Sequence, residues 1–174
     1  MLKNKLLNFK IRQALKHDRL KRKNTPYQIS KHIGIINTTG DHIYEPIIKL
    51  EEKIKADRKE VTVMAFHPDK KEKFSDLKYD YFTKEDITMA GAVNSFPLKD
   101  FMEYPFDYLI CTDLQLSPIM QLILAKSTAS CRMGTYSEGK DRFFELMIGG
   151  VDNMHTFTDR IYHYLSQIRS NGSV

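Results

Sequence analysis

Two short polar stretches hold the residues best suited to chemistry, Thr38–Asp41 and Asp113–Ser117. Each follows an apolar run, and ligands of parallel sheets bind beyond the ends of such strands. Gly40 would let the backbone approach a ligand, while the carboxylate of Asp41 could act as a general base. The candidate ligand-cleft residues are Thr38, Thr39, Gly40, Asp41, Asp113, Gln115 and Ser117.

Both aspartates also have a purely structural interpretation. Gly40 would then make a turn and Asp41 would cap the following helix. Asp113 could bind a hydroxylated ligand or orient Thr39, or it could accept hydrogen bonds from the backbone amides of its own loop.

The sequence lacks the motifs of the common catalytic and cofactor sites. It contains no G-x-G-x-x-G, no G-x-x-x-x-G-K-[ST] and no G-x-S-x-G. The 6 histidines lack the spacing of metal ligands, and the 2 cysteines form no C-x-x-C pair. We therefore expect no cofactor and no metal, and we favour a non-catalytic protein.

Positive charge is concentrated at the N-terminus. Residues 1–25 hold nine Lys and Arg against one acid, a net charge of +8, so the remaining chain carries −3 of the total of +5. Such asymmetry indicates an anionic partner. The predicted polyanion-binding residues are Lys3, Lys5, Lys10, Arg12, Lys16, Arg19, Lys21, Arg22 and Lys23.

Apolar runs and helical spacing alternate along the chain after this segment. Strands are predicted at residues 33–37, 61–66, 79–82, 108–111 and 143–148, with another near Cys131. Helices are predicted at residues 2–23, at 43–56, from Pro118 onward and through 157–168, where Thr156 and Asp159 resemble a capping box.

This alternation is typical of an α/β fold with a single Rossmann-like parallel sheet, helices on both faces, and an edge that could be mixed. If the strand order is 3-2-1-4-5-6, the switch point lies between the strands that end at Asn37 and Thr112. Residues 1–26 are predicted to form a basic helical arm, and residues 27–174 the Rossmann-like domain.

Three further expectations follow from composition. Cys111 and Cys131 each fall in a predicted strand, so both should be buried and reduced. No apolar run reaches the length of a transmembrane helix, and no secretory signal follows the basic N-terminus. A cytoplasmic location is therefore expected.

The chain resembles an uncharacterised family of short bacterial α/β proteins over nearly its whole length. Besides the basic helix, the matching segments are Ile33–Ile35, Tyr81–Lys84, Phe106–Ile110, Arg132–Tyr136, Leu146–Ile148 and His163–Leu165. The resemblance carries no assigned activity.

A second resemblance is to the first half of heptosyltransferase-like glycosyltransferases. It rests on Thr38–Asp41 with Pro46, on Phe106-Asp107 through Gln115, and on Arg132–Gly134. This resemblance implies that Asp41 is a catalytic base. Those enzymes hold the sugar-nucleotide donor on a second domain, whereas after Val151 this chain has room for one helix only, so independent glycosyl transfer is not expected.

We therefore expect a non-catalytic Rossmann-like binding or adaptor protein whose basic helix contacts nucleic acid or the ribosome. A membrane surface is less favoured because the helix lacks tryptophan, and Lys10 and Arg12 interrupt its apolar stripe. The alternative is a reduced glycosyltransferase-like protein that binds a nucleotide or sugar at the cleft. The helix could also pack on the domain with its charge in solvent, or dock on a partner protein.

Overall fold

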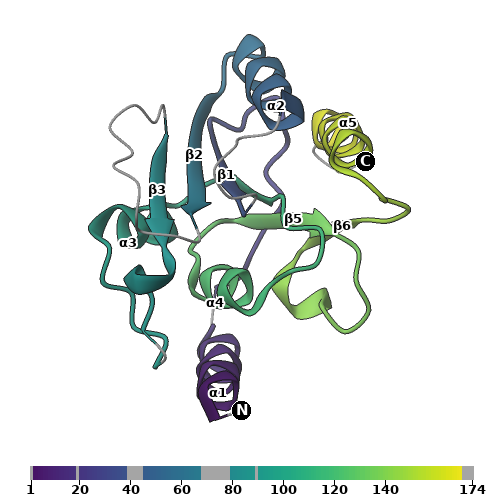
Figure 1. Cartoon of the computed structure of the whole chain (residues 1–174). Coiled ribbons are helices and arrows are strands. Elements are labelled where there is room, and N and C mark those ends of the chain that lie inside the picture. Colours follow the sequence, from purple (N-terminus) through teal and green to yellow (C-terminus); the bar gives the residue numbers. More distant parts are fainter. Residues whose placement is uncertain (1, 19, 39–44, 68–78, 89, 170–174) are drawn as a thin grey trace.

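The computed structural model describes residues 2–18, 20–38, 45–67, 79–88 and 90–169 (Figure 1). The helices are α1 (Leu2–His17), α2 (Glu45–Ala56), α3 (Phe96–Glu103), α4 (Pro118–Lys126) and α5 (Met154–Gln167). The strands are β1 (His32–Asn37), β2 (Glu60–His67), β3 (Asp80–Thr83), β4 (Tyr108–Cys111), β5 (Cys131–Thr135) and β6 (Leu146–Ile148). Lys84–Asp86 and Asp141–Phe143 form single turns of 3₁₀ helix.

The strands form one sheet in the order β3-β2-β1-β4-β5-β6. Every neighbouring pair is parallel, including those at both edges, as when Ile35 of β1 lies beside Val63 of β2 and Ile110 of β4. The predicted Rossmann-like fold and strand order are confirmed. All strands therefore end at the same edge of the sheet, and the chain reverses its direction of winding between β1 and β4.

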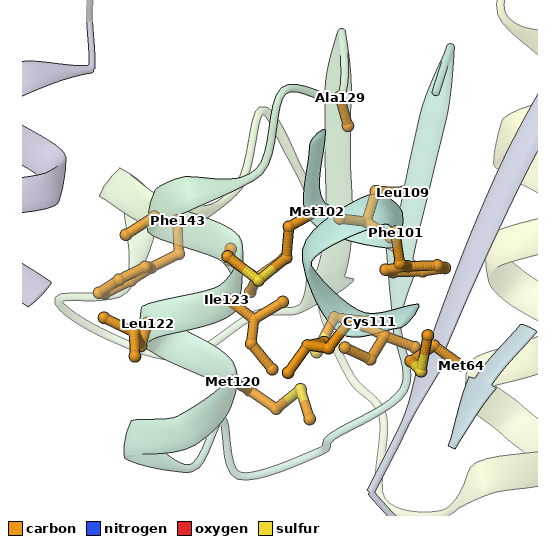
Figure 2. Packing of buried hydrophobic residues seen from close by; sticks show 14 of the residues in the cluster. Met64, Phe101, Met102, Leu109, Cys111, Met120, Leu122, Ile123, Ala129 and Phe143 are labelled. Atoms are coloured by element: carbon orange, nitrogen blue, oxygen red, sulfur yellow. The ribbon is translucent and has the colours of Figure 1, made fainter. Parts of the chain in front are cut away.

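Helices cover both faces of this sheet, and each face has its own apolar core (Figure 1). Ile33 and Ile35 of β1 pack under α2 and α5, while Ile36 faces the side of α1, α3 and α4 because side chains alternate along a strand. Figure 2 shows the core on the side of α3 and α4, where apolar side chains of α3, α4 and β4 pack together.

The boundaries of two predicted helices are wrong. α1 ends at His17, and the chain beyond it places Arg22 at the C-terminal end of α4, beside the carbonyl oxygen of Ser127. α5 begins earlier than predicted, with Asn153 as its N-cap: its side-chain oxygen accepts a hydrogen bond from the backbone amide of Thr156 at 2.9 Å. The predicted capping box at Thr156 and Asp159 is therefore incorrect.

α1 packs lengthwise on α4, on the face of the sheet that α3 and α4 cover (Figure 1). Ile11 is only 3% exposed and belongs to the same core as the buried residues of α3 and α4. Leu7, Ala14 and Leu15 pack against that core from the same side of the helix. The apolar stripe of α1 is thus covered by the protein's own α4.

The state of the two cysteines agrees with the prediction from sequence. Cys111 and Cys131 are buried free thiols, as predicted. None of the helices in the described part of the chain is long and apolar enough to cross a membrane.

Candidate functional site

The structure brings the ends of β1 and β4 together, as the strand order requires. The backbone amide of Thr112 donates to the carbonyl oxygen of Ile36 at 3.0 Å, so Thr38 and the Asp113–Ser117 loop leave neighbouring strands at the switch point. Thr39, Gly40 and Asp41 lie outside the described residues. The role of Asp41 as cap or base therefore stays a prediction.

Asp113 holds its own loop. Its two carboxylate oxygens accept hydrogen bonds from the backbone amides of Gln115 at 3.0 Å and Ser117 at 2.7 Å. Between them, Leu116 is buried with a φ of +50°, a left-handed conformation that costs a non-glycine residue about 1–2 kcal/mol. Ser117 then caps α4 by accepting from the amide of Met120. Asp113 and Ser117 therefore build the turn into α4, and Gln115 is exposed on it.

A row of polar side chains lies along the same edge of the sheet, and we call Asn37, Thr112 and Thr135 the polar row. Each follows strand residues that point into the core under α2 and α5, so alternation places all three on that face. The Oγ1 atom of Thr112 lies 3.3 Å from Oδ1 of Asn37. Because Met133 pairs with Ile110, Thr135 stands level with Thr112 on the adjacent strand.

Thr135 differs from its neighbours in the polar row. Asn37 and Thr112 are buried and engaged in polar contacts, but the buried hydroxyl of Thr135 has no hydrogen-bond partner among the residues described. An unsatisfied buried hydroxyl costs about 1–3 kcal/mol. Sequence reasoning missed this row, although a signal existed: β1 and β5 each end in a polar residue at a core-facing position.

Three basic residues of α1, Lys5, Arg12 and Lys16, are exposed on the side of the helix opposite its packed apolar stripe. Lys5, Phe9, Arg12 and Lys16 recur at i, i+4, i+7 and i+11, and all four are exposed; we call them the cationic face. Phe9 is 58% exposed, and no ion pair involves the three cations within the described part of the chain.

The remaining predicted polyanion-binding residues have different surroundings. Lys10 is half-buried beside Gln13, to which its ammonium donates at 3.2 Å. Lys21 and Lys23 are exposed after the helix. Arg19 and the side chain of Lys3 lie outside the described residues.

Arg22 must be removed from the predicted polyanion-binding residues. Its side chain is only 6% exposed. The guanidinium donates to the carboxylate of Asp18 at 2.6 Å and to the carbonyl oxygens of Ser127, at 2.9 Å, and Ala129. Its charge is therefore used inside the fold and is not presented to a partner.

Arg22 forms part of what we call the buried charge cluster, which consists of Asp18, Arg22, Arg132 and Glu145. Arg132, with a side chain 4% exposed, donates to Glu145 at 2.7 Å and lies 3.8 Å from Asp18. Arg22 lies 3.5 Å from Glu145. Two positive and two negative groups thus neutralise one another where the N-terminal segment meets β5 and the residue before β6.

The thiols are poorly suited to nucleophilic chemistry. Burial raises the pKa of Cys111 to about 12, and burial, followed by the nearby Glu145 carboxylate, raises the pKa of Cys131 to about 12. Both remain protonated at neutral pH, and the thiolate is the reactive form.

Comparison with known proteins identifies the family. A family of unknown function (DUF6913) matches residues 3–168. The chain belongs to this family. The match covers nearly all of α1, the whole sheet and α5. The predicted membership in a family without assigned activity is confirmed. The curated proteins and the solved structures gave no match.

Proposed function

We propose that this protein is a non-catalytic binding or adaptor protein that contacts nucleic acid, such as ribosomal RNA, through the cationic face of α1. The observation that carries the proposal is the separation of the two sides of this helix. Leu7, Ile11, Ala14 and Leu15 pack on the core that includes α4, whereas Lys5, Arg12 and Lys16 are exposed around Phe9. Cations spaced along one face suit phosphates, and an exposed aromatic ring suits a base.

The same separation argues against a membrane surface as the partner. A helix that lies in the interface of a bilayer buries a continuous apolar face in the lipid. In α1 that face is already occupied by α4, since Ile11, Leu7 and Leu15 all belong to or pack on the core. Among the described side chains of α1, the exposed large apolar groups are Leu6 and Phe9, at 42% and 58% exposure, a small apolar area for insertion.

Neutralising the cationic face should weaken RNA binding about tenfold at low salt. The variant replaces Lys5, Arg12 and Lys16 by glutamine, which preserves helix propensity. Each lost phosphate contact on a single strand reduces the slope of log affinity against log salt by about 0.7, so the slope should fall by about 2. Fluorescence anisotropy with a labelled mixed-sequence oligonucleotide across a salt series measures both quantities.

A matched control makes the same change in net charge elsewhere. Lys49 and Lys53 of α2 and Lys84 of the first 3₁₀ turn are exposed, and their replacement by glutamine should leave the affinity within twofold. Equal losses in the two triple variants would show that net charge alone drives binding. Absence of salt-sensitive binding by the unmodified protein would refute the proposal.

The polar row supports a second candidate function, the binding of a small hydroxylated ligand such as a nucleotide or sugar at the switch point. The supporting observation is the buried hydroxyl of Thr135, which lacks a partner among the described residues at the edge where such folds bind ligands. A ligand oxygen or amide at this edge would satisfy it. The resemblance of Thr38–Asp41 to the first loop of glycosyltransferases agrees with this alternative.

Thr135→Val distinguishes a binding role from a defect in packing. Valine has nearly the shape of threonine and removes the unsatisfied hydroxyl, so the variant should be more stable by about 1 kcal/mol in urea unfolding. If the row binds a ligand, the same variant should lose the thermal stabilisation that a screen of nucleotides and sugar nucleotides produces in the unmodified protein. A less stable variant would show that the hydroxyl is already satisfied in the free protein.

A further inference from the structure

A groove of about 600 Å³ opens between the end of α1, α3 and α4. Val93, Met102 and Ala125 line it with apolar groups, and His17, Lys99 and Lys126 contribute basic groups. The volume is within the usual range for pockets that enclose a small molecule or one unit of a polymer. Because His17 is on α1, the groove adjoins the helix that carries the cationic face.

The charges around the groove are unbalanced. The ammonium of Lys126 donates to the carbonyl oxygen of Gly91 at 2.8 Å, and its pKa is lowered by burial and then by the nearby charge of Lys10. Asp18 also lines the groove, but Arg22 already binds its carboxylate at 2.6 Å. Among the described residues that line the groove, Glu103, which is exposed, is the one remaining acid that opposes the basic side chains. The groove therefore favours an anionic occupant with an apolar part.

We propose that the groove holds one unpaired nucleotide of a single-stranded nucleic acid, with the base over the apolar lining and the phosphate toward Lys99 and Lys126. This inference rests on the proposed function and specifies its substrate class. In a duplex the bases are stacked inside and cannot enter a recess, whereas a single strand can place a base there and its backbone on the adjoining cationic helix. A glutamate-rich peptide would match the charges, but its side chains supply no flat ring for the apolar lining.

The test compares three labelled RNA probes with the full-length protein: an intact single strand, the same strand with abasic sites, and the duplex. The unmodified protein should bind the intact strand at least fivefold more tightly than either other probe. Lys99→Glu should weaken binding of the intact strand about fivefold and remove its advantage over the abasic strand. Glu103→Lys, one turn along α3, should strengthen binding about threefold. Lys84→Glu, whose side chain does not line the groove, is the matched control.

The outcomes separate the groove from the cationic face. Equal affinity for intact and abasic strands, or equal effects of Lys99→Glu and Lys84→Glu, would overturn the groove inference. The proposed function would still stand if binding depended on the cationic face of α1. Failure of all three probes to bind would overturn both. A glutamate-rich peptide that binds in a Lys99-dependent manner, without discrimination between intact and abasic strands, would assign the groove to a protein partner instead.

Discussion

Arg132→Met is expected to lower the free energy of unfolding by about 3 kcal/mol. Arg132 lies at the centre of the buried charge cluster and donates both to Glu145 and, at 2.9 Å, to the carbonyl oxygen of Leu124. Methionine fills similar volume but leaves two carboxylates opposed by Arg22 alone. Breaking a buried ion pair from one side costs about 3–5 kcal/mol, and the lower value applies because Glu145 retains 22% exposure.

Arg142→Met is the matched control for this loss. Arg142 is exposed, and only its backbone carbonyl oxygen contacts Arg132, at 3.3 Å. Its replacement should change stability by less than about 0.5 kcal/mol, the usual effect of a surface substitution. Urea unfolding at neutral pH measures both variants. Similar midpoints for the two would show that the cluster contributes little to the fold.

Ile11→Ala should cost about 2 kcal/mol, because Ile11 is the most deeply buried of the described side chains of α1. Burial of an isoleucine at 3% exposure predicts a loss of about 2–5 kcal/mol on truncation to alanine. We expect the lower end, because α1 lies outermost and can settle onto α4 after the change. Hydrogen exchange of the α1 amides, together with urea unfolding, measures the effect.

Phe9→Ala is the control on the opposite side of the same helix. Phe9 is 58% exposed, so its truncation should leave stability almost unchanged. If Ile11→Ala is equally neutral, residues 1–26 form an arm that does not contribute to the domain, as the division at residue 27 predicts. A loss confined to Ile11→Ala would place α1 energetically within the domain.

Sequence reasoning was most successful where the information is local or periodic. The apolar run at Tyr108–Cys111 and the Ser117-Pro118 helix start identified a strand and a helix, and regular alternation then fixed the parallel sheet and its switch point. The structural interpretation of Asp113 also depends on neighbours within four residues. These features need no knowledge of distant contacts.

The features that could not be predicted depend on partners far along the chain. Arg22 is indistinguishable in sequence from its basic neighbours, and only contacts with Ser127 and Glu145 bury it. Whether the hydroxyl of a threonine at the end of a strand finds a hydrogen-bond partner depends on every element that packs over it. That the hydroxyl of Thr135 lacks a partner among the described residues could therefore not be predicted. The end of α1 was misjudged because the first helix-breaking residue in the sequence is Pro26, whereas the chain leaves the helix after His17 and turns toward the cluster.

The buried charge cluster also has a consequence for the order in which the chain folds. Arg22 is separated by more than a hundred residues from its partners at Ser127, Ala129 and Glu145, so these contacts close a very long loop. Long-range closures of this kind form late, after the local strand–helix units have provided something to dock on. During synthesis α1 is made before α4, on which it packs, and Asp18 and Arg22 are made before Arg132 and Glu145. Until α4 has been synthesised, α1 is therefore a cationic, undocked segment on a chain whose sheet is incomplete.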